Sequence, residues 1–292
     1  MSRRDRRVIN PPATSAHAAD GAPAESRTLI RQSAEPRYGV PVGATNSDEE
    51  ALIGGNAAAS VVRIGDTVHK PWLQTTELTV AYMRALRDRG IDLPEPRGRD
   101  AQGRLVLEYV PGDLAINRGP LEASLLHRIG ALVRTIHEAS IGLPVPDTWE
   151  VLLPADRPNL LCHNDLATWN LIIDRARLVF IDWDGAGPST RLWDLAYAAI
   201  SFGHLFAGED PDVALGRLVA FLDGYDVDDV LRAALPKTMA QRARAMHELL
   251  RRSHDSGRQP WGSMYVDGHG EHWGSAVAFI ARHEQAWSRA LS

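Results

Sequence analysis

Residues 161–182, which read LCHNDLATWNLIIDRARLVFID, carry three oxygen-bearing side chains at informative positions. Asp165 and Asn170 lie in a polar loop after a buried apolar run, and Asp182 ends a second apolar run over residues 178–181. In a hairpin built from this stretch, the three side chains converge at one end. Such a group of oxygens can hold a divalent metal against phosphates and orient a substrate hydroxyl.

Phosphoryl transfer needs metal ions and a cation on the phosphates, and an acceptor for the proton of the substrate hydroxyl. The neutral amide of Asn170 can ligate Mg²⁺ without placing a second full negative charge beside Asp165. An aspartate at the end of an apolar strand, such as Asp182, requires a metal, a cation or strong hydrogen bonds. In the alternative interpretation Asp165 and Asn170 only form a turn and Asp182 only caps the segment after it. That alternative leaves the combined spacing unexplained, so we favour a phosphoryl-transfer site.

The elements upstream of this stretch form a β-rich segment. Residues 61–64 and 67–70 are short β-prone runs on either side of Gly65 and Asp66, which predicts a tight hairpin. Apolar residues then recur at helical spacing from Leu78 to Leu86, and Gly90 ends this predicted helix. Residues 104–110 predict a third strand. The order strand, strand, helix, strand is typical of a small α+β lobe.

The chain beyond Leu121 is mainly helical in its pattern. An apolar stripe runs to residue 136, and further helices are predicted over residues 193–204, 213–225, 231–252 and 275–291. The hairpin between Asp165 and Asp182 is the only β structure that we predict in this part. We therefore expect a flexible tail over residues 1–47, a β-rich N-lobe over residues 48–112 and a helical C-lobe over residues 113–292.

Composition limits the class of protein. The 292 residues are 44% hydrophobic and 24% charged, as in a globular protein with a sizeable core. The net charge of −5 gives no basic field for nucleic acid, and no apolar run is long enough for a membrane span. The single cysteine, Cys162, excludes an internal disulfide. We expect a cytoplasmic protein without nucleic-acid or membrane partners.

The sequence resembles the aminoglycoside phosphotransferase and choline kinase family, whose members are kinase-like enzymes. The segment from His163 to Asn170 resembles the family's H-x-D-x4-N catalytic loop, which is of the Brenner type. The residues IDWD at 181–184 resemble its I-D-W segment, the counterpart of the DFG aspartate of protein kinases. The residues DLA at 194–196 resemble the start of a family helix. Asn164 departs from the pattern, because many members have glycine at that position.

The resemblance implies a two-lobed, protein-kinase-like α+β fold and a role for each matching residue. Asp165 would accept or orient the proton of the acceptor hydroxyl, and Asn170 and Asp182 would ligate Mg²⁺. Asp194 would brace the backbone of the catalytic loop. The phosphate donor would be ATP or GTP.

The resemblance also implies nucleotide contacts in the N-lobe. Lys70 would reach the α- and β-phosphates, and Glu77, at the start of the next helix, would pair with it. Gly54 and Gly55 would form a loop over the phosphates. In the connector between the lobes, the carbonyl of Glu108 and the N–H of Val110 would face adenine.

These features together predict an enzyme that moves the γ-phosphate of ATP or GTP to a hydroxyl of a small molecule. Aminoglycoside, choline-like, amino-alcohol and sugar acceptors all stay open. A catalytically silent nucleotide-binding module on the same fold is the alternative. A protein kinase is disfavoured, because only about a dozen residues separate Asp182 from Asp194 and leave little room for a peptide platform.

Overall fold

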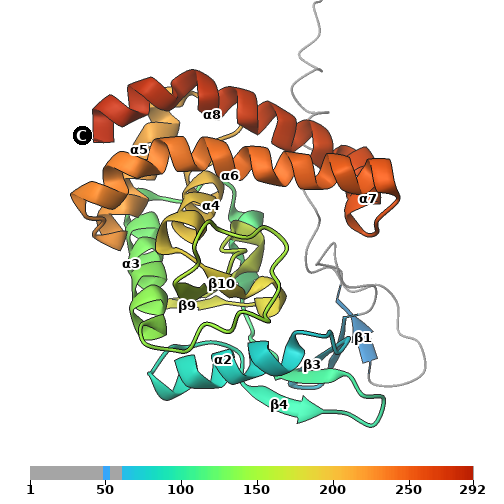
Figure 1. Cartoon of the computed structure of the whole chain (residues 1–292). Helices are drawn as coiled ribbons and strands as arrows, with labels where there is room; N and C mark the ends of the chain where they lie inside the picture. Colours follow the sequence, from blue (N-terminus) through green and yellow to red (C-terminus); the bar gives the residue numbers. More distant parts are fainter. Residues whose placement is uncertain (1–48, 53–60, 292) are drawn as a thin grey trace, which may run out of the picture. The chain divides into compact units, whose positions relative to one another are not determined.

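The computed structural model describes residues 49–52 and 61–291. All of the described residues lie within one compact unit. The predicted α+β fold class, with a small β-rich part followed by a larger helical part, is confirmed (Figure 1). The tail predicted over residues 1–47 lies outside the described residues. In the described part of the chain, no helix is both long and apolar enough to cross a membrane.

A five-stranded antiparallel sheet forms the first part, with the strands in the order β1-β2-β3-β5-β4. The predicted hairpin is present, because β2 and β3 pair across Gly65 and Asp66. The elements are β1 (Glu49–Ala51), β2 (Val62–Ile64), β3 (Thr67–Lys70), α2 (Thr76–Asp88), β4 (Pro96–Arg99) and β5 (Leu105–Glu108). Strand β3 lies inside the sheet, which fixes the position of Lys70 at its end.

Helix α2 joins this sheet to the rest of the molecule. Its side chains Tyr82, Met83 and Leu86 are buried in the main core. The hydroxyl of Tyr82 donates to the carbonyl oxygen of Leu161 at 2.9 Å, and it lies 2.7 Å from the hydroxyl of Ser140. Helix α2 therefore contacts the strand that leads into the catalytic loop.

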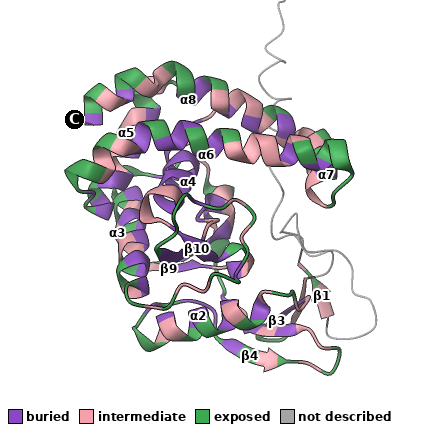
Figure 2. Cartoon of the chain, viewed as in Figure 1, coloured by how far each residue is buried: buried purple, intermediate pink, exposed green. Residues whose placement is uncertain are grey.

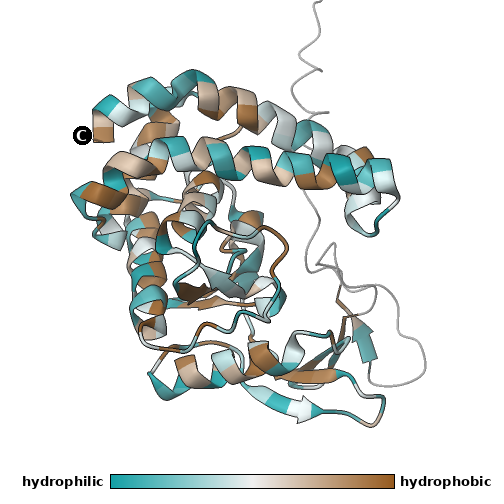
Figure 3. Cartoon of the chain, in the orientation of Figure 1, coloured by the Kyte–Doolittle hydropathy of each residue, from teal (hydrophilic) through white to brown (hydrophobic). Residues whose placement is uncertain are grey.

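The second part is built from paired helices. Helices α3 and α5, α6 and α8, and α4 and α6 make the main contacts. Figure 2 shows α4 almost entirely buried, whereas α6 and α8 each keep an exposed side. The long elements are α3 (Ala123–Ser140), α4 (Arg191–Gly203), α5 (Pro211–Tyr225), α6 (Asp229–Ser256) and α8 (Gly270–Leu291). Hydrophilic and hydrophobic positions alternate along α6 and α8, as expected for helices with one face on a core (Figure 3).

The hairpin of β8 (Leu171–Asp174) and β9 (Arg177–Phe180) is present as predicted. The prediction that it is the only β structure in this part is wrong. Strand β6 (Asp113–Leu114) pairs with β8, and β7 (Leu160–Cys162) pairs with β10 (Gly187–Ser189). Strands of two or three residues are too short for an alternating pattern, and Gly-Pro-Ser has low β propensity.

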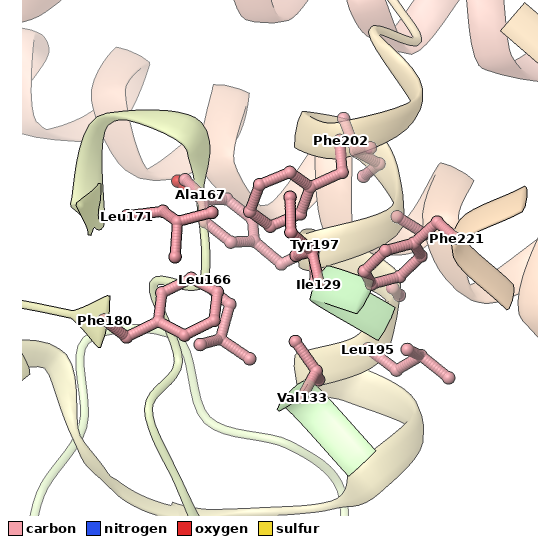
Figure 4. Packing of buried hydrophobic residues seen from close by; sticks show 14 of the residues in the cluster. Ile129, Val133, Leu166, Ala167, Leu171, Phe180, Leu195, Tyr197, Phe202 and Phe221 are labelled. Atoms are coloured by element: carbon pink, nitrogen blue, oxygen red, sulfur yellow. The ribbon is translucent and has the colours of Figure 1, made fainter. Parts of the chain in front are cut away.

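A continuous core packs against the catalytic loop (Figure 4). Leu166 of the loop, Leu171 of β8 and Phe180 of β9 are fully buried beside Phe202 of α4. The Phe202 ring in turn stacks on Phe221 of α5, with ring centroids 5.6 Å apart. Because buried side chains are close-packed, this core holds the loop and the hairpin in one conformation.

Helices α3 and α5 approach so closely that only glycine fits at their contact. A Cβ atom on Gly224 would overlap the carbonyl oxygen of His127. We expect Gly224→Ala to lower the free energy of unfolding by about 1–3 kcal/mol, because the helices must move apart. Urea unfolding measures this change. Gly216→Ala on the same helix is the control, because nothing lies within 4 Å of its Cβ position. Alanine there should stabilise the protein by about 0.5–1 kcal/mol, and equal effects of the two variants would contradict the prediction.

Candidate active site

The catalytic loop follows β7 and closes on itself through Asn170. The amide nitrogen of Asn170 donates to the Asp165 carboxylate at 2.8 Å and to the Asp165 carbonyl oxygen at 3.0 Å. Asn170 is only 3% exposed and ends a short 3₁₀ turn, η2 (Thr168–Asn170). The structure thus brings together two of the three side chains singled out in the sequence.

The Asp165 carboxyl is partly buried, and its surroundings tune its charge. Burial raises the pKa of Asp165 above its ordinary value, and the negative charge of Asp182 raises it further. The nearby His163 and hydrogen bonds from Tyr197 and Asn170 act in the opposite direction. The result is a carboxylate that takes up a proton more readily than an exposed aspartate does.

Lys70 and Asp182 meet although 112 positions separate them. The Lys70 ammonium, on a side chain that is almost fully buried, lies 2.7 Å from Oδ1 of Asp182 and 2.8 Å from Oδ2 of Asp184. Burial disfavours the charged ammonium, but the two carboxylates outweigh this effect and raise the pKa of Lys70 above its ordinary value. Lys70 therefore stays protonated and anchors both carboxylates.

The pKa values of the two carboxylates beside Lys70 shift in opposite directions. Burial opposes ionisation of Asp182, but the attraction of Lys70 outweighs it and lowers the pKa of Asp182 below its ordinary value. Burial, together with the charge of Asp182, raises the pKa of Asp184. Asp182 adopts a left-handed backbone with φ of 58°, at the start of the turn η3 (Trp183–Gly185). This turn is what places Asp184 next to Asp182 on the same ammonium.

The prediction that Glu77 pairs with Lys70 is wrong. Glu77 is exposed in the first turn of α2, while the buried face of this helix packs on the core. The ammonium of Lys70 is already held by Asp182 and Asp184. Glu77 makes no ion pair among the described residues, and its position in the first turn suits the helix dipole.

Asp194 braces the catalytic loop, as predicted. Its Oδ1 accepts a hydrogen bond of 2.8 Å from the backbone N–H of Asn164. Its Oδ2 lies 3.0 Å from Nε2 of His137, whose Nδ1 lies 2.8 Å from the hydroxyl of Tyr225. The side chains of Asp194, His137 and Tyr225 are fully buried. A carboxylate bonded on both oxygens fixes the loop to helices α3, α4 and α5.

The nucleotide contacts predicted in the N-lobe are partly outside the described residues. Gly54 and Gly55 lie there. Glu108 ends β5, and its backbone N–H donates to the carbonyl oxygen of Glu95. Val110 packs against Ile172 and Val179, and its N–H donates to no acceptor within the described ranges. Their contacts with adenine stay a prediction.

Comparison with known proteins identifies a related family over part of the chain. Residues 143–231 match the phosphotransferase enzyme family (APH). The family resemblance noted in the sequence is thereby confirmed over that segment, which contains the catalytic loop, Asp182 and Asp194. A search of curated proteins gives no match.

Solved structures with the same fold include several small-molecule kinases. Amicoumacin kinase hAmiN, in complex with AMP-PNP, Ca²⁺ and Ami, is 15% identical, covers 91% of this chain and 94% of its own, and superposes with a TM-score of 0.56. A choline/ethanolamine kinase family protein from Mesorhizobium loti is 18% identical, with coverages of 84% and 93% and a TM-score of 0.56. The microcompartment-associated aminopropanol kinase is 14% identical, with coverages of 91% and 98% and a TM-score of 0.54. The two-lobed, protein-kinase-like fold is therefore established.

Three residues at this site have no role predicted from the sequence. Asp184 follows Asp182 by two positions, so the IDWD segment that contains both residues was the feature of the sequence that could have indicated it. Tyr197 bonds Asp165 from α4, three residues after Asp194. Arg242 of α6 lies over the Tyr197 ring at 4.3 Å and donates to the carbonyl oxygen of Asn164 at 3.2 Å. Nothing in the local sequence connects Arg242 to the loop, because it lies far along the chain.

Proposed function

We propose that the protein transfers the γ-phosphate of ATP or GTP to a hydroxyl group of a small molecule. The observation that carries this proposal is that one buried ammonium, on Lys70, holds Asp182 and Asp184 in the same site as the Asp165–Asn170 pair. Lys70 binds the phosphates, and Asp165 accepts or orients the hydroxyl proton of the acceptor. The match of residues 143–231 to phosphotransferases supports this reaction class.

The donor set of the site fits Mg²⁺. The amide nitrogen of Asn170 is occupied by Asp165, which leaves its amide oxygen as the atom available to a metal. Asp182 and Asp184 add carboxylate oxygens, and Mg²⁺ prefers oxygen ligands together with water and phosphate. Bound Mg²⁺ would neutralise charge on the phosphates. We propose Asn170 and Asp182 as its ligands, with Asp184 as a third oxygen donor beside them.

The raised pKa of Asp165 suits a proton acceptor in this reaction. A carboxylate with a higher pKa holds a proton better, which matches the task of taking one from a hydroxyl. Hydrogen bonds from Asn170 and Tyr197 fix the orientation of this carboxylate. Asp165 thereby presents a defined oxygen to the acceptor, while the Lys70 group holds the donor.

The test is an assay of Mg²⁺-dependent ADP or GDP release by the purified full chain with a panel of hydroxyl compounds. The panel should include choline, ethanolamine, aminopropanol, aminoglycosides and sugars, because the similar structures are named for kinases of several of these. We expect acceptor-dependent release that chelation of Mg²⁺ abolishes. Nucleotide binding without release for any acceptor would favour the catalytically silent module instead.

A further inference from the structure

Asn164 precedes Asp165 and has a left-handed backbone, with φ of 64°. Its backbone N–H donates to Asp194 at 2.8 Å, and its carbonyl oxygen accepts from Arg242 at 3.2 Å. These two bonds use main-chain atoms, so any residue at this position could make them. The side chain must be explained separately.

The side-chain amide of Asn164 contacts the segment that follows Asp182 and Asp184, the proposed metal ligands. Its Nδ2 donates to the carbonyl oxygen of Gly185 at 3.1 Å and to that of Gly187 at 3.4 Å. Gly185 ends the turn that contains Asp184, and Gly187 begins β10. One side chain thus joins the loop of the proton acceptor to the segment of the proposed metal ligands.

Neither backbone preference nor the side-chain oxygen explains this asparagine. Glycine adopts a left-handed backbone with less strain than asparagine does. The Oδ1 atom of Asn164 is buried without a hydrogen-bond partner in the described part of the chain, which is also unfavourable. Unfavourable features of this kind concentrate at functional sites.

We propose that Asn164 is a positioning residue whose amide sets the Asp165 loop at a fixed distance from the Asp182–Asp184 segment. This inference rests on the proposed function, because the fixed distance matters only if both segments act on one reaction. A phosphoryl acceptor bound at Asp165 and a donor held at Asp182 must meet in line, and a small displacement of one segment costs rate.

Asn164→Gly is the decisive variant, because it keeps both main-chain bonds and relieves the backbone. We expect kcat to fall by about 10- to 100-fold, with little change in the KM for nucleotide. Aspartate in Asn164→Asp tolerates the same backbone conformation, but its carboxylate oxygen faces the two glycine carbonyl oxygens and repels them. The kcat of this variant should therefore fall further. If only backbone preference mattered, the glycine variant would equal or exceed the wild type.

Arg175→Gly is the matched control, since Arg175 is exposed, has φ of 52° and lies in the β8–β9 turn away from the site. It should leave kcat unchanged. Amide hydrogen exchange of residues 183–190 gives a readout without turnover, and we expect faster exchange in Asn164→Gly but not in Arg175→Gly. Unchanged exchange, or unchanged kcat despite faster exchange, would overturn the positioning role. Absence of turnover in the wild type with every acceptor would instead overturn the proposed function, and the exchange result would still decide whether the amide holds the segment.

Discussion

Asp165→Asn should lower turnover by about 10²- to 10⁴-fold, the range expected when a general base is removed. The asparagine side chain has the same shape and keeps a hydrogen-bonding oxygen, but it does not take a proton from an acceptor hydroxyl. Nucleotide binding should be retained, because the Lys70, Asp182 and Asp184 group is untouched. Steady-state kinetics and nucleotide titration measure the two effects separately.

The same variant should not destabilise the protein. Burial raises the pKa of Asp165, so the folded state binds the proton of this group more tightly than the unfolded chain does. Stability from such a group is present below the unfolded pKa and is lost as pH rises through the folded pKa, so near pH 7 the charge opposes folding. The Tm of Asp165→Asn should therefore equal or exceed that of the wild type, as expected of a functional residue.

Asp174→Asn provides the matched control for this substitution. Asp174 ends β8 and pairs in the hairpin with Arg177, outside the site. The turnover of Asp174→Asn should match that of the wild type. Wild-type turnover in Asp165→Asn itself would remove Asp165 from the proposed role.

The contacts of the site that could be predicted are those between residues close together in the sequence. Asp165 and Asn170 are five residues apart, so their meeting results from one loop, and the place of Asp182 results from one hairpin. Lys70 meets Asp182 from 112 positions away, and the sequence did not predict this contact, because the family resemblance placed Lys70 on the phosphates and paired it with Glu77. Local pattern cannot supply it, because the whole core has to form first.

Glu77 shows why the resemblance alone was insufficient. The sequence predicts its position in the first turn of the helix, but the direction of its side chain depends on how α2 rotates against the core. The rotation that buries Tyr82 and Met83 leaves Glu77 exposed. Asp184, which the motif contained, takes the place at Lys70 because the left-handed Asp182 turns the chain back toward the ammonium.

Lys70→Met should produce the second large effect, a loss of about 10²- to 10³-fold in kcat/KM for nucleotide. Methionine fills a similar volume but leaves Asp182 and Asp184 without their cation. The mutual repulsion of the two carboxylates then raises both of their pKa values. It should also lower the free energy of unfolding by about 1–2 kcal/mol. This loss is smaller than for a fully buried pair, because the Asp182 side chain is 36% exposed. Steady-state kinetics with varied nucleotide measure the change in kcat/KM, and urea unfolding measures the change in the free energy of unfolding.

A divalent metal should partly reverse the instability of Lys70→Met. With the ammonium gone, both carboxylates are free to bind Mg²⁺, and a ligand that binds only the folded state raises the Tm. We expect Mg²⁺ to raise the Tm of Lys70→Met more than that of the wild type. The sequence has one other lysine, Lys237, which is exposed on α6, so Lys237→Met is the matched control and should leave kinetics and Mg²⁺ response unchanged. An equal Mg²⁺ response in Lys70→Met and wild type would show that Asp182 and Asp184 do not form a metal site, whatever the effect on turnover.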